Sequence, residues 1–185
     1  SGWQLFEPGS AMILQIRLWR LLLGVTVGAS LGVAGLVMQS VLRNPLADPY
    51  VLGLSAGGGL GTALAVLAGV ALPVLMPLAG FLGALASLAA VLLLGRATRG
   101  GAATLLLAGV TWSALCSSLL MLLVTRFDRP GLHSVVWWFL GDLQVHHPPL
   151  VITAALLGLA GLAAATACTR ALTILSLGDE LAAYL

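Results

Sequence analysis

One pentapeptide in the sequence has the spacing of a hydrolase nucleophile. Residues 53–57 read GLSAG, which matches the G-x-S-x-G pattern that places a reactive serine on a strand-to-helix turn. Such a serine needs a histidine and an acid, and no acid stands near Ser55. The histidines, His133, His146 and His147, all lie in one later polar segment. Ser55 is therefore not interpreted as a nucleophile, and we expect a chain that is not an enzyme.

The histidine pair and the two cysteines are weak candidates for a metal or haem site. His146 and His147 are adjacent, and neighbours on one backbone rarely supply two ligands to one ion. A polar loop ahead of Pro148 and Pro149 is the favoured interpretation of this pair. Cys116 and Cys168 lie in apolar runs without a CxxC motif, as expected for small hydrophobic side chains. The sequence predicts neither a metal site nor a cofactor.

The charged residues exclude several further chemistries. The chain has eight arginines and no lysine, so it lacks a Walker A lysine, a Schiff-base lysine and a lysine base. Any ATP that the system uses must therefore bind to another chain. The formal net charge of +2 is too small to indicate a nucleic-acid partner.

The elements that carry these residues must lie in a membrane. Of the 185 residues, 60% are hydrophobic and 8% are charged, against roughly 25% charged residues in an ordinary soluble domain. The mean hydropathy is +1.10. So few charges cannot cover a soluble surface, and disordered chains are poor in apolar residues. We expect an all-α, polytopic membrane protein, because open sheets leave backbone groups unpaired in lipid.

Charge-free stretches set the number of spans. Residues 49–95 would form a helix of roughly 70 Å, longer than the ~30 Å hydrocarbon core, so the chain must turn back near Pro73 and Pro77. This reasoning predicts five spans, at about 19–42, 50–71, 78–95, 103–125 and 150–169. Arginines divide four against four between the two sides, so the positive-inside rule leaves the orientation open.

Three polar features stand out against the apolar background. Arg17 and Arg20 are three residues apart, on one helix face, just before an apolar span. Residues 43–49 (RNPLADP) form a compact polar turn between two spans. Residues 177–183 (LGDELAA) begin an amphipathic segment after the last span. Each also has a purely structural reading, as interfacial anchors, a helix stop and an interfacial tail helix respectively.

At these residues the chain resembles a known family. It is similar to the FecCD-type permease subunits of ABC importers for ferric siderophores, haem and cobalamin. The resemblance rests on residues 16–61 (IRLWRLLLGVTVGASLGVAGLVMQSVLRNPLADPYVLGLSAGGGLG), followed in order by LLLAGVTWSAL, VVWWFLGDL and LSLGDELAAYL. It extends from about Gln15 to Leu185. One departure is Trp19, where the family usually has proline.

The resemblance implies an architecture, a location and partners. Family members have about ten spans, so residues 1–185 are expected to be one incomplete permease domain containing about the second to the sixth span. The expected setting is the cell inner (plasma) membrane, with an external N-terminus. The implied partners are ATP-binding cassette subunits, a periplasmic substrate-binding protein, a second permease subunit and membrane lipid.

The resemblance also assigns roles at the two ends of the molecule. Arg17 and Arg20 match external arginines that dock acidic residues of the binding protein. Gly178, Asp179 and Glu180 match the start of the coupling helices that contact the ATPase, within a cytoplasmic segment at 170–185.

A cytoplasmic gate is implied between these ends. Asn44 and Leu46 match a turn that helps close the inner end of the translocation path. Gly101, Ala102 and Ala103 match a second constriction, where related proteins often carry small hydroxyl residues. Glycine and alanines at these positions make a polar gate a weaker expectation here.

The resulting interpretation is a transport subunit for an iron-siderophore, haem or cobalamin-type substrate. A non-transport membrane assembly or structural protein derived from a permease segment is the alternative. The choice among the three substrates, and between a homodimer and a heterodimer, stays open at this point.

Overall fold

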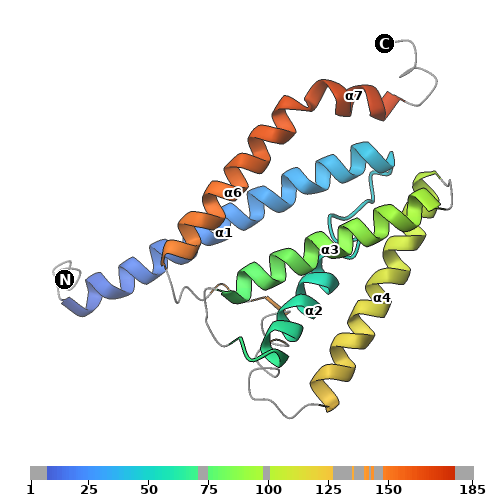
Figure 1. The fold of residues 1–185 in the computed structure, drawn as a ribbon. Helices are drawn as coiled ribbons and strands as arrows, with labels where there is room; N and C mark the ends of the chain where they lie inside the picture. Colours follow the sequence, from blue (N-terminus) through green and yellow to red (C-terminus); the bar gives the residue numbers. More distant parts are fainter. Residues whose placement is uncertain are drawn as a thin grey trace. The chain divides into compact units, whose positions relative to one another are not determined.

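The computed structural model describes residues 8–70, 75–97, 101–126, 135, 140, 141, 143 and 148–177. Its regular elements are helices, and the described residues contain no strand (Figure 1). The helices are α1 (Pro8–Leu42), α2 (Leu54–Leu67), α3 (Leu75–Ala97), α4 (Ala102–Arg126), α6 (Pro148–Ala167) and α7 (Thr169–Leu177). This confirms the all-α membrane fold expected from composition.

Four of the helices are long and apolar enough to cross a membrane. Helices α3, α4 and α6 begin and end within three residues of the predicted spans at 78–95, 103–125 and 150–169. The predicted span at 50–71 instead contains α2, an apolar helix of 14 residues. At about 1.5 Å per residue α2 extends roughly 21 Å, less than the ~30 Å hydrocarbon core.

Helix α1 begins well before the predicted span at 19–42. It starts at Pro8 and contains 35 residues. Proline is favoured in the first turn because its missing N–H would have no helical partner there. The helix ends at Leu42, and Arg43 follows with a φ of 49°, the left-handed conformation that commonly terminates helices.

The chain divides into two compact units. In the unit Val41–Asp142, α2 packs against α3 and α4. The approach of α2 to α3 depends on glycine, because a Cβ added to Gly83 would lie 2.9 Å from the Cα of Gly61. Alanine at either position would force the two backbones apart. Beside this crossing lies a core cluster of buried apolar side chains: Ala63, Val66, Leu120 and Val135.

The other unit combines Ser1–Ser40 with Leu143–Leu185 and holds most of α1 together with α6 and α7. A Cβ added to Gly158 of α6 would lie 2.7 Å from Oγ of Ser30 on α1, so these helices touch at that point. Helix α6 ends at Ala167, and Cys168 separates it from α7. The N–H of Leu172 donates to the Cys168 carbonyl at 2.9 Å, so helical hydrogen bonding continues across the boundary.

Candidate functional site

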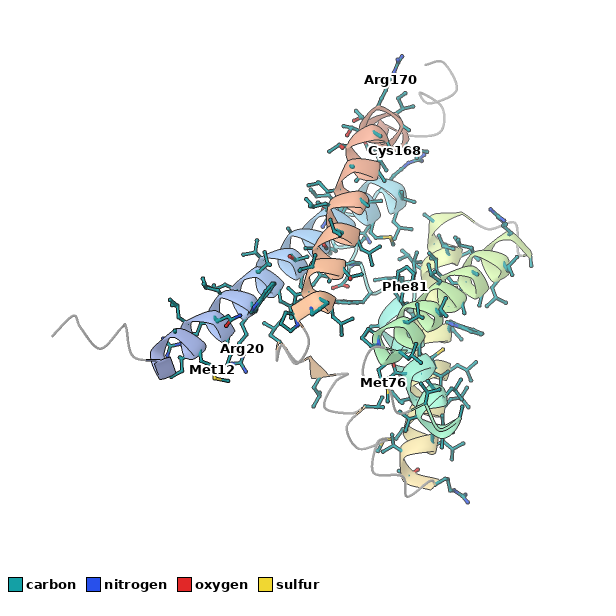
Figure 2. All side chains as sticks on the ribbon, turned by 60° about the vertical axis from the view of Figure 1, so that its left-hand side comes forward. Met12, Arg20, Met76, Phe81, Cys168 and Arg170 are labelled. Atoms are coloured by element: carbon teal, nitrogen blue, oxygen red, sulfur yellow. The ribbon has the colours of Figure 1, made fainter. Side chains whose placement is uncertain are left out.

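The two arginines predicted to dock a binding protein lie within α1 rather than ahead of it. Arg17 and Arg20 are both exposed, and their spacing of three residues places them on one face of the helix. Figure 2 shows Arg20 on the same N-terminal stretch of α1 as Met12. The helical backbone holds the two guanidinium groups one turn apart, which is suited to two neighbouring carboxylates.

The predicted gate turn at 44–47 is built by an asparagine side chain. Oδ1 of Asn44 accepts a hydrogen bond from the N–H of Leu46 at 2.9 Å, and its carbonyl accepts one from Ala47 at 3.0 Å. Such side-chain turns are typical of asparagine before proline. The side chain of Leu46 is 88% exposed, whereas those of Leu42 and Ala47 are buried. The turn at 44–47 is therefore held by its own hydrogen bonds and exposes the side chain of Leu46.

A second side-chain turn follows directly. Oδ1 of Asp48 accepts a hydrogen bond from the N–H of Tyr50 at 2.7 Å. The N–H groups of Val51 and Gly53 then donate to the carbonyls of Asp48 and Tyr50, at 3.2 and 2.9 Å. Residues 44–53 thus form a chain of turns that satisfies much of its own backbone, without helix or strand.

The second predicted constriction lies at the start of α4. The Gly101 carbonyl accepts hydrogen bonds from the N–H groups of Thr104 and Leu105, at 3.0 and 3.2 Å, so Gly101 caps the helix. Gly101, Ala102 and Ala103 are all exposed. The first hydroxyl after this cap is Thr104.

The structure brings some of the predicted site residues into one unit and not others. Asn44, Leu46 and residues 101–103 all belong to Val41–Asp142, whereas Arg17 and Arg20 belong to the other unit. The coupling residues Gly178, Asp179 and Glu180 lie outside the described residues. The described chain reaches Leu177 through α7, and Figure 2 shows Cys168 and Arg170, both exposed, where α6 gives way to α7.

Ser87 was not singled out by the sequence. It carries the one hydroxyl side chain of α3, and only 3% of its surface is exposed. Its Oγ donates a hydrogen bond of 2.8 Å to the carbonyl of Gly53, at the start of α2. An isolated polar residue in an apolar helix was the only available signal, and it does not identify a partner 34 residues away.

A face of α4 also escaped the sequence reading. Hydroxyl side chains recur on it every seven residues: Thr104, Thr111, Ser118 and Thr125. Seven residues are close to two helical turns, so these groups share one face over roughly 31 Å. They lie opposite the buried Gly109 and Cys116, and the last three are exposed. The exposed face of α3 is instead apolar, with Leu82, Leu85 and Leu93.

Among the described residues, no three His, Cys, Asp or Glu side chains gather where they could hold a metal ion. The polar features of the described residues are instead the turns at 44–53, the exposed arginines of α1 and the hydroxyl face of α4. A profile of the FecCD transport family matches residues 4–185. The chain belongs to the FecCD transport family. The motifs in residues 16–61 and 105–115, which carried the resemblance, lie within this match.

Two similar proteins are named as transport permeases. The hemin transport system permease protein HmuU of Yersinia pestis is 39% identical over 181 residues, covering 93% of this chain and 53% of that protein. The cobalamin import system permease protein BtuC of Halobacterium salinarum is 34% identical over 177 residues, covering 94% of this chain and 47% of that protein. The chain therefore spans about half the length of these relatives.

A solved structure of similar fold is described as an inward-facing conformation of a metal-chelate type ABC transporter. It is 27% identical, with a TM-score of 0.85, and the match covers 97% of this chain and 57% of that chain. FecCD membership and the four membrane-length helices indicate a multi-pass membrane protein.

Proposed function

We propose that the chain forms part of the translocation path of a binding-protein-dependent ABC importer. Its substrate is a metal chelate of the iron-siderophore, haem or cobalamin type. Two ATP-binding cassette subunits hydrolyse ATP, a periplasmic protein delivers the substrate, and a second permease subunit completes the path in the inner membrane. Named relatives that transport hemin and cobalamin support this assignment. No observation favours a non-transport assembly protein.

The observation that carries the proposal is the hydroxyl face of α4. Helices that face lipid gain most from apolar side chains, as on the exposed face of α3. A row of hydroxyls as long as the hydrocarbon core is suited to water and to a polar substrate. The hydroxyls of Thr111 and Thr125 donate to the carbonyls of Leu107 and Met121, both at 2.9 Å, so they offer oxygen lone pairs rather than strong donors. Such a surface binds weakly, as a wide path requires.

A serine or threonine hydroxyl that bonds to a carbonyl of its own helix can also face lipid. Accessibility to water must therefore decide whether this face of α4 lines a path or contacts lipid. In a transporter with Cys116 and Cys168 replaced by alanine, we expect Thr111→Cys and Ser118→Cys to react with a membrane-impermeant thiol reagent. The matched control is Leu85→Cys, at an exposed apolar position of α3. Equal protection of all three cysteines from the reagent would contradict a water-filled path along α4.

Orientation is a separate proposal, since arginine counting gave none. We infer that the start of α1 is external, whereas residues 43–47, residues 98–101 and α7 are cytoplasmic. In the same cysteine-free background, Leu46→Cys, Gly101→Cys and Ser176→Cys should react only after the inner membrane is permeabilised. Met12→Cys should react from the periplasm. Each of these residues is exposed, so lack of reaction reports sidedness rather than burial. The reverse pattern would overturn every assigned role.

A further inference from the structure

The segment that joins α1 to α2 is fastened to α3 and α4. The Gly53 carbonyl accepts the hydroxyl of Ser87 at 2.8 Å. The Val51 carbonyl lies against Gly109 of α4, so closely that a Cβ at Gly109 would collide with it. Both contacts lie within the single unit Val41–Asp142.

These contacts lie deep in the helices rather than at their ends. Ser87 is ten residues before Ala97, the last residue of α3, which corresponds to about 15 Å. Gly109 is seven residues after Ala102, the first residue of α4, which corresponds to about 10 Å. Both helix ends lie on one side of the membrane, because only residues 98–101 join them. Figure 1 shows α2 beginning beside the middle of α3.

Helix α2 therefore begins inside the membrane. Residues 48–53 connect the membrane surface on the side of the gate turn to the start of α2, and they do not form a helix. Irregular backbone is tolerated there only where its polar groups are satisfied within the protein. The Gly53 carbonyl meets this requirement twice, by accepting the Gly57 N–H at 2.9 Å and the Ser87 hydroxyl. Gly53 has a φ of 77°, which strongly favours glycine. This explains why α2 has only 14 residues.

We propose that Ser87 is a positioning residue for the gate turn at 44–47. Its bond to Gly53 fixes residues 44–53 to α3, and the packing of Val51 against Gly109 fixes them to α4, which begins at Ala102. The Leu46 turn and the start of α4 then move as one rigid piece during transport, so the two halves of the gate open together. The gating role of both turns rests on the proposed function, but the rigid link between them rests on the contacts described above.

The test measures distances between spin labels on Leu46→Cys and Gly101→Cys in the complete, reconstituted transporter. A sample labelled only at position 46 identifies the distances between the two permease subunits. We expect a narrow 46–101 distribution that stays the same without nucleotide and with ATP trapped, while the distance between subunits changes. Ser87→Ala should broaden the 46–101 distribution and raise passive substrate leak about fivefold, the effect of losing one buried hydrogen bond.

Ser113→Ala is the matched control. The Ser113 hydroxyl also lies near Gly53, 3.1 Å from the position of an added Cβ, but it donates to Gly109 within its own helix at 2.8 Å. It should leave both the distribution and the leak unchanged. Gly53→Ala provides a second perturbation, and should broaden the distribution as Ser87→Ala does.

The outcomes separate the inference from the proposed function. A 46–101 distance that changes with ATP, or a Ser87→Ala distribution as narrow as that of Ser113→Ala, would overturn the rigid link. If ATP changes neither the 46–101 distance nor the distance between subunits, the importer assignment fails. Broadening by Ser87→Ala would then still support the positioning role.

Discussion

Asn44 holds Leu46 in place through a bond from side chain to backbone, with Oδ1 of Asn44 2.9 Å from the nitrogen of Leu46. The leucine side chain itself is 88% exposed. The polar residue thus shapes the turn, and the apolar residue is free to close against a partner surface. Substitutions at Asn44 and at Leu46 are therefore expected to have different effects.

Asn44→Ala should loosen the turn, whereas Asn44→Asp should preserve it, because aspartate keeps the accepting oxygen. A bond of this kind contributes about 1 kcal/mol, so alanine should speed hydrogen exchange at the Leu46 amide about fivefold. Exchange measured by mass spectrometry over peptides covering 44–53 checks this. Equal exchange in the two variants would show that the prolines alone maintain the turn.

The crossing of α2 and α3 gives a stability prediction. Gly83→Ala should lower the free energy of unfolding by about 1–3 kcal/mol, because its Cβ has no room beside Gly61. Gly161→Ala on α6 is the control, since nothing lies within 4 Å of its added Cβ and alanine favours helix. Thermal unfolding of the purified transporter in detergent compares them. Similar midpoints for both variants would contradict the close approach of these helices.

The arginines of α1 should act in docking. We expect Arg17→Glu combined with Arg20→Glu to abolish binding of the periplasmic protein, because like charges then meet at the contact. Arg17→Lys with Arg20→Lys should weaken binding only in part, since lysine keeps the charge but not the bidentate geometry. Affinity is measured at low and high salt, because the contacts are screened over ~8–10 Å at ordinary ionic strength. Unchanged affinity in the reversed variant would mark the arginines as membrane anchors.

Gly178, Asp179 and Glu180, the proposed coupling residues, follow α7 in the sequence, and their role is tested through function. Gly178→Leu, or Asp179→Arg with Glu180→Arg, should separate ATP hydrolysis from transport in the complete permease. Leucine removes the backbone freedom of glycine, and positive charge would oppose the helix N-terminus that the family resemblance implies at these residues. Hydrolysis and uptake are measured together in proteoliposomes. Normal coupling in both variants would remove this segment from the ATPase contact.

Much of the fold was predictable because charges mark the ends of apolar stretches. Arg96 and Arg126 lie in the last turns of α3 and α4, so those boundaries were predicted within three residues. The start of α1 was predicted too late because Arg17 and Arg20 were taken as the end of the apolar stretch, whereas the helix continues through them into the apolar residues 11–16. Helix α2 was predicted too long, because hydropathy cannot distinguish a buried turn from a helix.

The candidate site divides in the same way. The local motif predicted a polar turn at Asn44 and Leu46, the family resemblance alone implied its gate role, and the structure adds the bond that joins the two residues. Ser87 could not be found, because its role depends on a contact with Gly53 that only packing creates. The hydroxyl face of α4 was present in the sequence as a seven-residue period, and it gained meaning only when the opposite face proved to be buried.

The importer assignment is tested most directly by uptake into proteoliposomes that contain the complete permease with its ATPase subunits. The candidate substrates are a ferric siderophore, haem and cobalamin, each supplied with the binding protein. We predict ATP-dependent accumulation of one of them, abolished when the binding protein is omitted. If a transporter shown to hydrolyse ATP accumulates none of the three, or accumulates one equally well without the binding protein, the account is contradicted.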